Sequence, residues 1–135
     1  MKNKTILDFL PINFRHEKSY MIQNKILDFE SLSDLSDLDI NNILKNYPLC
    51  TLNNLKKIRA MAIFKKQIKI SPPEAYILLH CGVSSIKSLS QLKPYELEDK
   101  IGRLERKLRV KTESNISLPI LKDWIERANK VLDSI

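Results

Sequence analysis

The chain has 135 residues, of which 43% are hydrophobic and 29% charged, and its formal net charge is +7. This length fits one domain or two very small ones, and the apolar content excludes wholesale disorder. Only two glycines occur, fewer than a β-rich fold with many tight turns needs, so the composition favours helices. No stretch approaches the roughly 20 apolar residues of a membrane span, and the first residues lack the pattern of a signal peptide.

The two cysteines, Cys50 and Cys81, fit neither a disulfide framework nor a metal-ligand spacing. Buried thiols in a reducing compartment are the expected state, so we expect a cytoplasmic protein with no membrane partner.

In chain order, residues 1–17 are weakly patterned and are expected to form an N-terminal extension, because Pro11 ends any helix begun near residue 4. Apolar spacing then predicts a helix over Tyr20–Phe29. Leucines at 32, 35 and 38 predict a short helix, and a second one follows from Ile40 to about Lys45.

A long helix is expected from Thr51, a suitable N-cap, to about Lys69. Its inward positions are expected at Leu52, Leu55, Ile58 and Ala62.

The stretch SPPEAYILLHCGVSSIKSLSQL, residues 71–92, predicts two helices joined at a corner. Ser71 and Glu74 have the spacing of a capping box, and Pro72 suits the first helical position. Gly82 stands where the first helix should stop, since glycine adopts the left-handed conformation without a Cβ clash. Ser84 or Ser85 can cap the second helix.

The carboxyl-terminal part predicts two amphipathic helices. The first starts at Pro94 and turns Leu97, Ile101, Leu104 and Leu108 inward. Residues 110–117 are mostly polar and are expected to form a loop, and Ser117 is expected to cap the last helix. Its inward face is formed by Leu121, Trp124, Ile125, Ala128, Val131, Leu132 and Ile135.

The two halves of the chain match each other when they are overlaid. When each residue is aligned with the one 54 positions later, Phe29 corresponds to Val83, and Asp28 stands at the position of Gly82. When the shift is 66 positions, Leu52 corresponds to Leu118. The sequence therefore predicts an all-α fold with two tandem helical units joined by a long helix. Their expected bounds are 18–69 for a degenerate first unit and 70–135 for the second.

The positive charge is concentrated in two blocks. Residues 40–73 contain seven basic and no acidic side chains, and residues 100–111 contain six basic and one acidic. Positive charge that is clustered in blocks indicates an anionic partner better than net charge does, although solvated helix faces are often rich in lysine as well. The candidate nucleic-acid-binding residues are Lys56, Lys57, Arg59, Lys65, Lys66, Lys69, Arg103, Arg106, Lys107 and Arg109.

The segment EAYILLHCGVSSIKSLSQLKPYELEDKIGRL, together with LKDWIERAN, resembles helix-hairpin-helix-like domains, and more narrowly the domain of unknown function 4332 family. The resemblance covers about residues 71–132, with a degenerate copy over 18–64. It implies an all-helical fold of tandem helix-hairpin-helix (SAM-like) units and an unassigned role, for which nucleic-acid binding is one candidate.

The hairpin corner Gly82, Val83 and Ser84 departs from DNA-binding relatives, which carry two glycines around an aliphatic residue. The second glycine lets backbone N–H groups approach a phosphate, and serine stands in its place here. A simple helix C-cap is therefore favoured over a phosphate nest at Gly82.

No pattern of catalytic residues emerges. His80 and Cys81 are adjacent, but a metal site or nucleophile needs converging partners that the spacing does not supply. The carboxylates Glu96, Glu98 and Asp99 are better explained as complements to a helix N-terminus. An enzyme, a metal and a cofactor are therefore not expected.

The sequence predicts a non-enzymatic helical module that binds DNA or RNA through basic helix faces. Two alternatives stay open: an adaptor that docks an acidic protein partner, and a structural subunit with no nucleic-acid role.

Overall fold

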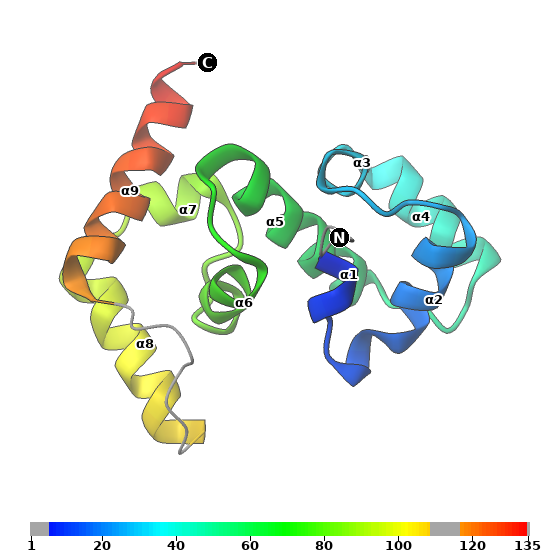
Figure 1. The fold of residues 1–135 in the computed structure, drawn as a ribbon, viewed down its shortest axis with the longest axis horizontal. Helices are drawn as coiled ribbons and strands as arrows, with labels where there is room; N and C mark the ends of the chain where they lie inside the picture. Colours follow the sequence, from blue (N-terminus) through cyan, green and yellow to red (C-terminus); the bar gives the residue numbers. More distant parts are fainter. Residues whose placement is uncertain (1–5, 109–116, 135) are drawn as a thin grey trace, which may run out of the picture. The chain divides into compact units, whose positions relative to one another are not determined.

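The computed structural model describes residues 6–108 and 117–134 (Figure 1). Every regular element over these residues is helical, which confirms the all-α prediction. The elements are α1 (Ile6–Phe9), the 3-10 helix η1 (Ile12–Phe14), α2 (Arg15–Gln23), α3 (Phe29–Ser33), α4 (Asp37–Asn46), α5 (Leu52–Ile68), α6 (Pro72–His80), α7 (Ile86–Ser90), α8 (Pro94–Leu108) and α9 (Leu118–Asp133). None of the described helices combines the length and the apolar character that crossing a bilayer requires.

The chain divides into two compact units, residues 1–66 and 67–135. The boundary lies inside α5, whose last two residues belong to the second unit. Helical structure in the first unit begins at Ile6, within the expected N-terminal extension, and Leu7, Leu10 and Phe14 are all buried there.

The predicted helix over Tyr20–Phe29 is wrong at both ends. Helix α2 begins at Arg15 and stops at Gln23, because Lys25 adopts a left-handed backbone with φ 57°. The N–H of Lys25 donates to the carbonyl of Ile22, and the N–H of Ile26 donates to that of Met21, which is a Schellman ending. Met21 is fully buried, whereas Ile22 is 51% exposed.

Two short helices follow, and side-chain caps set where each begins. The Asp28 carboxylate accepts from the N–H of Ser31 at 2.6 Å at the start of α3. Ser36 and Asp39 form a reciprocal capping box, so α4 starts three residues before the predicted Ile40. Leu38 therefore lies on the outer face and is 68% exposed.

A buried carboxylate ties the start of α5 to α2. Glu17 is 1% exposed, and its Oε2 accepts from the backbone N–H of Thr51 at 2.8 Å. Its Oε1 accepts from the amide of Asn54 at 3.2 Å, and the Thr51 hydroxyl accepts from the backbone N–H of Asn54, which confirms Thr51 as the cap. Leu55 and Ile58 are fully buried, whereas Leu52 remains 43% exposed.

The corner of the second unit forms as predicted. The Ser71–Glu74 capping box begins α6, and Gly82 follows the helix with φ 84°. The N–H of Val83 donates to the carbonyl of Leu78 at 2.9 Å, and Val83 is buried at the corner. Ser85, one of the two expected serines, caps α7 by accepting from the N–H of Ser88.

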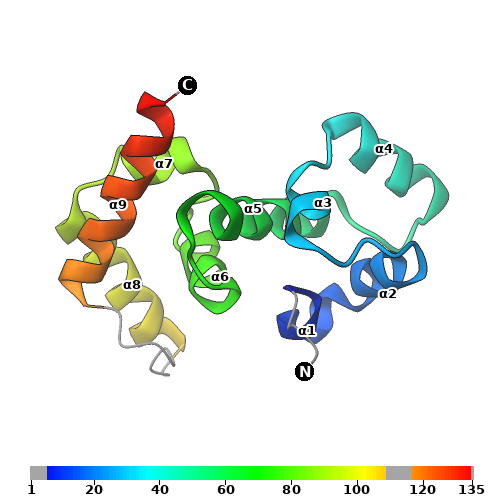
Figure 2. The same ribbon diagram turned by 45° about the horizontal axis from the view of Figure 1, so that its top comes forward.

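Helices α8 and α9 complete the second unit. Helix α9 packs against both α7 and α8, and the three lie side by side in both views (Figures 1 and 2). Four of the predicted inward residues of α9 are buried: Leu121, Trp124, Ile125 and Ala128. Ser117 stands at the N-cap, but its side chain makes no capping bond. The predicted loop over 110–117 falls almost wholly outside the described residues.

Candidate nucleic-acid interface

The acid-free run of the sequence lies beside acidic side chains in the folded first unit. Arg59 of α5 donates from Nη1 to Asp37 Oδ1 at 2.9 Å and to the Leu35 carbonyl at 3.1 Å. Its side chain is only 21% exposed. Two of its donor contacts are thus already made within the unit, and a phosphate would compete with them.

Lys65 and Lys66 also turn towards the segment that carries these acids. Lys66 Nζ lies 3.6 Å from Glu30 and 3.5 Å from Asp34. Lys65 Nζ lies 5.9 Å from the centre of the Phe29 ring, in cation–π range. The structure therefore brings together three of the six candidate cations of the 40–73 block, but it brings them to α3 and α4 rather than to open solvent.

The other candidates of this block occupy different positions. Lys56 is exposed and Lys57 half-buried on α5. Lys69 follows the end of α5 in a left-handed conformation, with φ 59°.

The second block is more open. Lys100, Arg103 and Arg106 are all exposed and lie within two turns of α8. Arg103 forms an ion pair with Asp99 at 3.0 Å, one turn away, and its side chain remains 73% exposed. Such surface pairs contribute about 0–1 kcal/mol, so Arg103 can exchange this partner for another anion. The side chain of Lys107 and the whole of Arg109 lie outside the described residues.

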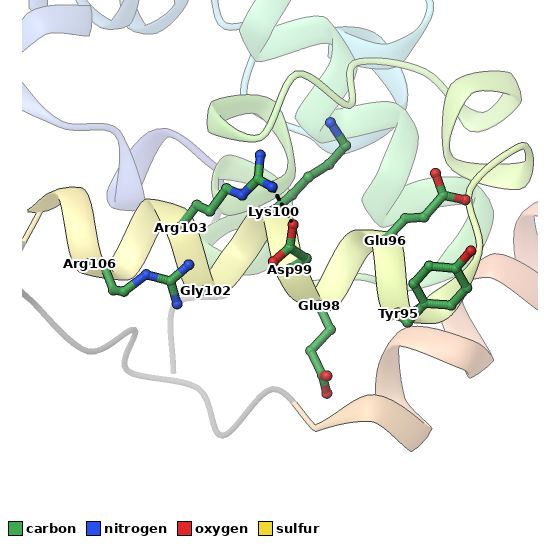
Figure 3. Close-up of a pocket in the computed structure, with 8 residues that line it drawn as sticks. All are labelled: Tyr95, Glu96, Glu98, Asp99, Lys100, Gly102, Arg103 and Arg106. Atoms are coloured by element: carbon green, nitrogen blue, oxygen red, sulfur yellow. Dashed lines mark ion pairs between the residues drawn. The ribbon is translucent and has the colours of Figure 1, made fainter.

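An open hollow of about 660 Å³ runs along α8 (Figure 3). Lys100 and Arg103 extend to one side of the helix, and Glu98 extends to the opposite side (Figure 3). Arg106 lies back over Gly102, where an added Cβ would sit 3.3 Å from its Nη1. The basic side chains lie towards the carboxyl end of the hollow, and the acidic Glu96, Glu98 and Asp99 towards its amino end.

The hairpin corner offers an anion little. Ser85 and Ser88 bond each other's backbone N–H groups at the start of α7, so these donors are already used. A Cβ added to Gly82 would meet no other atom within 4 Å. Glycine is therefore favoured at this position by the left-handed φ of the backbone and not by a close neighbouring atom. The geometry of Gly82, Val83 and Ser84 fits a C-cap followed by a capping box.

A pocket in the first unit escaped the sequence reasoning. It has a volume of about 210 Å³ and lies between α2 and the segment that joins α4 to α5. Four lining residues of α2, at 16, 19, 20 and 23, have helical spacing, which is a usable signal. It was missed because the predicted helix began at Tyr20.

Comparison with known proteins gives a family but no characterised relative. No curated protein and no solved structure matches the chain. The family described as domain of unknown function (DUF4332) matches residues 12–131, which extends well beyond the resemblance expected over 71–132 and includes the first unit. This match spans most of the sequence, and the chain therefore belongs to the DUF4332 family.

Proposed function

We propose that this protein is a non-enzymatic helical module that binds nucleic acid through the basic end of α8. The observation that carries the proposal is the placement of Lys100, Arg103 and Arg106 on exposed positions within two turns of one helix. The sequence continues this charge with Lys107, Arg109 and Lys111.

Phosphates supply most of the sequence-independent affinity of nucleic-acid-binding proteins, through Lys and Arg side chains that displace condensed counterions. The α8 cations suit this role better than Arg59 of α5, whose side chain is only 21% exposed and bonds both Asp37 and the Leu35 carbonyl. The surface pair of Arg103 with Asp99 leaves the Arg103 side chain 73% exposed. The proposal thus narrows two candidate blocks of the sequence to one surface.

Fluorescence anisotropy across salt concentrations, with labelled duplex DNA, single-stranded DNA and single-stranded RNA, tests this proposal. If the interface neutralises about five phosphates, log affinity should fall against log salt with a slope near −4.5 on duplex DNA and near −3.5 on the single strands. The double variant Arg103→Gln/Arg106→Gln should make the slope shallower by about 1.8 on duplex DNA and about 1.4 on the single strands.

A matched control removes the same charge elsewhere in the second unit. Lys87 and Lys130 are exposed on α7 and α9, and Lys87→Gln/Lys130→Gln should leave the slope nearly unchanged. A complete lack of binding at low salt, or equal effects of the two double variants, would contradict the proposed surface.

We further propose that the two units are copies of one helix-hairpin-helix-like unit. Helices α2 and α6 both have nine residues and begin at residues 15 and 72, which are 57 apart. Helices α3 and α7 both have five residues and begin at 29 and 86, again 57 apart.

The same spacing relates the corners of the two units. Lys25 and Gly82 both adopt left-handed backbones, with φ 57° and 84°. Asp28, which the sequence comparison had aligned with Gly82, is instead the N-cap of α3 and corresponds to Ser85, the N-cap of α7. The expected offset of 54 therefore changes to 57, and the offset of 66 fits the starts of α5 and α9.

An adaptor for an acidic protein is a second candidate, favoured by large apolar side chains on the surface of the first unit. Ile12 is 81% exposed, and Leu38 and Leu49 are each 68% exposed. Exposed apolar groups are more typical of protein contacts than of phosphate contacts. Binding to an acidic polypeptide such as polyglutamate, together with no binding to either nucleic acid, would favour this alternative.

A further inference from the structure

The pocket of the first unit is built by two segments that lie far apart in the sequence. Helix α2 contributes His16, Ser19, Tyr20 and Gln23, and the segment after α4 contributes residues 46–50. A bond from the N–H of Cys50 to the carbonyl of Tyr47, 3.0 Å long, closes that segment into a turn. The pocket walls are therefore held by a helix and a hydrogen-bonded turn.

The lining combines an apolar part, to which Pro48, Leu49 and Cys50 contribute, with a few polar side chains that carry no formal charge. No Asp, Glu, Lys or Arg is among the described residues that line it. It presents the side-chain amides of Gln23 and Asn46, two phenol groups and an imidazole. Gln23 donates to Ser19 Oγ at 3.5 Å, a long bond that is easily exchanged. Amides offer a donor and an acceptor side by side, as the edge of a nucleobase requires.

Two tyrosines form the aromatic wall. The rings of Tyr20 and Tyr47 meet edge to face, with their centroids 4.5 Å apart. Tyr47 is 37% exposed, and Leu49 beside it is 68% exposed. Burial, with smaller contributions from Tyr47, Cys50 and Asp39, raises the pKa of Tyr20, so its hydroxyl keeps its proton and can donate.

Basic residues stand next to this uncharged pocket in the sequence. Arg15 precedes His16, Lys18 precedes Ser19, and Lys45 precedes Asn46; Arg15 and Lys45 are exposed. The carboxylate of Asp39 acts on Tyr20 and that of Glu17 on Cys50, so charges of both signs surround the pocket. Its neutral lining therefore suits a neutral planar group. Its volume of about 210 Å³ is below the ~300–1,000 Å³ of sites for drug-sized ligands, which favours a single ring system.

We propose that this pocket binds one unstacked nucleobase of a single-stranded nucleic acid. The base stacks against the aromatic wall, and its edge bonds the amides of Gln23 and Asn46. The inference rests on the proposed function and adds to it a preference for single strands over duplexes, since a paired base cannot enter.

Free mononucleotides test the pocket without a strand. In NMR spectra of the full chain, AMP, GMP, CMP and UMP are compared with ribose 5-phosphate, which has the phosphate but no base. At least one mononucleotide should shift the side-chain amide signals of Gln23 and Asn46, and ribose 5-phosphate should not. Equal shifts by ribose 5-phosphate, or none by any nucleotide, would overturn the proposal.

Two variants localise the effect. Tyr47→Ala removes an aromatic ring and should weaken mononucleotide binding by about tenfold, in line with stacking energies for a single base. Gln23→Leu, at an exposed position, should weaken it while leaving the thermal unfolding midpoint unchanged. Tyr76→Ala on α6 also removes one ring of an edge-to-face pair, since Tyr76 meets His80 with centroids 4.4 Å apart, and it is the matched control that should leave mononucleotide binding unchanged. An equal loss in the Tyr76 variant would overturn the assignment.

A strand of about 15 nucleotides and a fully abasic strand of the same length then separate the two proposals. The strand with bases should bind about tenfold more tightly, and Tyr47→Ala should remove this difference. If both strands bind equally and still depend on Arg103 and Arg106, the pocket is overturned and the α8 surface stands. If mononucleotides bind and no strand does, the ligand of the pocket is a free nucleotide. That outcome overturns both the single strand as the ligand and the proposed function.

Discussion

Glu17 of α2 accepts a hydrogen bond from the backbone N–H of Thr51, 34 residues later, at 2.8 Å. The same carboxylate accepts from Asn54, whose amide also donates to the carbonyl of Asn13 at 3.0 Å. Glu17 and Asn54 together thus join η1, α2 and the first turn of α5.

Replacing this acid should be costly. Glu17→Ala leaves the part-buried N–H of Thr51 without its partner, and we expect a loss of about 2 kcal/mol in the free energy of unfolding. Urea denaturation measures it. Glu30→Gln, at a 76% exposed carboxylate that also contacts a cation, should change stability by less than about 0.5 kcal/mol. Comparable losses in both variants would show that burial of Glu17 is not the cause.

The two glycines of the chain should respond in opposite directions to alanine. Gly82→Ala places a Cβ on a left-handed backbone and should destabilise by about 1 kcal/mol or more. Gly102→Ala lies within α8, where the new Cβ meets the flexible end of Arg106, and should stabilise by about 0.5–1 kcal/mol. The thermal unfolding midpoints of the two variants test both predictions, and midpoint shifts of the same sign would refute this explanation.

Lys25 provides the reverse substitution. Because it holds φ 57° after α2, Lys25→Gly should relieve strain and stabilise by about 0.5–1 kcal/mol. Lys87→Gly, inside α7, serves as the control and should destabilise by about 1 kcal/mol. A loss of stability at Lys25 in chemical denaturation would mean that its side chain stabilises the corner by more than its backbone costs.

Acid should weaken the first unit through its caps. Hydrogen bonds from the backbone N–H groups of Ser31 and Ser36 lower the pKa values of Asp28 and Asp39. A lowered folded-state pKa gives stability that is fully present above the unfolded pKa, near 4, and is lost as pH falls through the folded value. Wild type should therefore lose more stability than Asp28→Asn/Asp39→Asn in urea titrations between about pH 5 and 2. Parallel curves would exclude this linkage.

Features that depend on neighbours in the sequence could be predicted. The Ser71–Glu74 box, the glycine ending at Gly82 and the cap at Thr51 each rest on residues within one turn of the feature, and all three are present. The inward residues of α9 were predictable for the same reason, since its apolar spacing is regular.

Features set by distant residues could not be predicted. Helix α2 turns a carboxylate, Glu17, into the core, so its apolar spacing is incomplete and its start was misplaced. It ends at a left-handed lysine, where sequence patterns lead one to expect glycine. The partners of the α5 cations could not be predicted for the same reason, because the acid-free run gives no sign that Asp37 lies beside Arg59 after folding.

Helix α5 crosses the division after Lys66, and this decides how the protein can be cut for experiments. A fragment ending at residue 66 would remove the last two residues of α5. A fragment starting at Ser71 would lose Ile68 and Ile70, which are 1% and 0% exposed, and the Ile68 carbonyl that accepts from Arg127 at 2.9 Å. Overlapping fragments, 1–70 and 51–135, each retain the whole of α5 and are the pair to prepare.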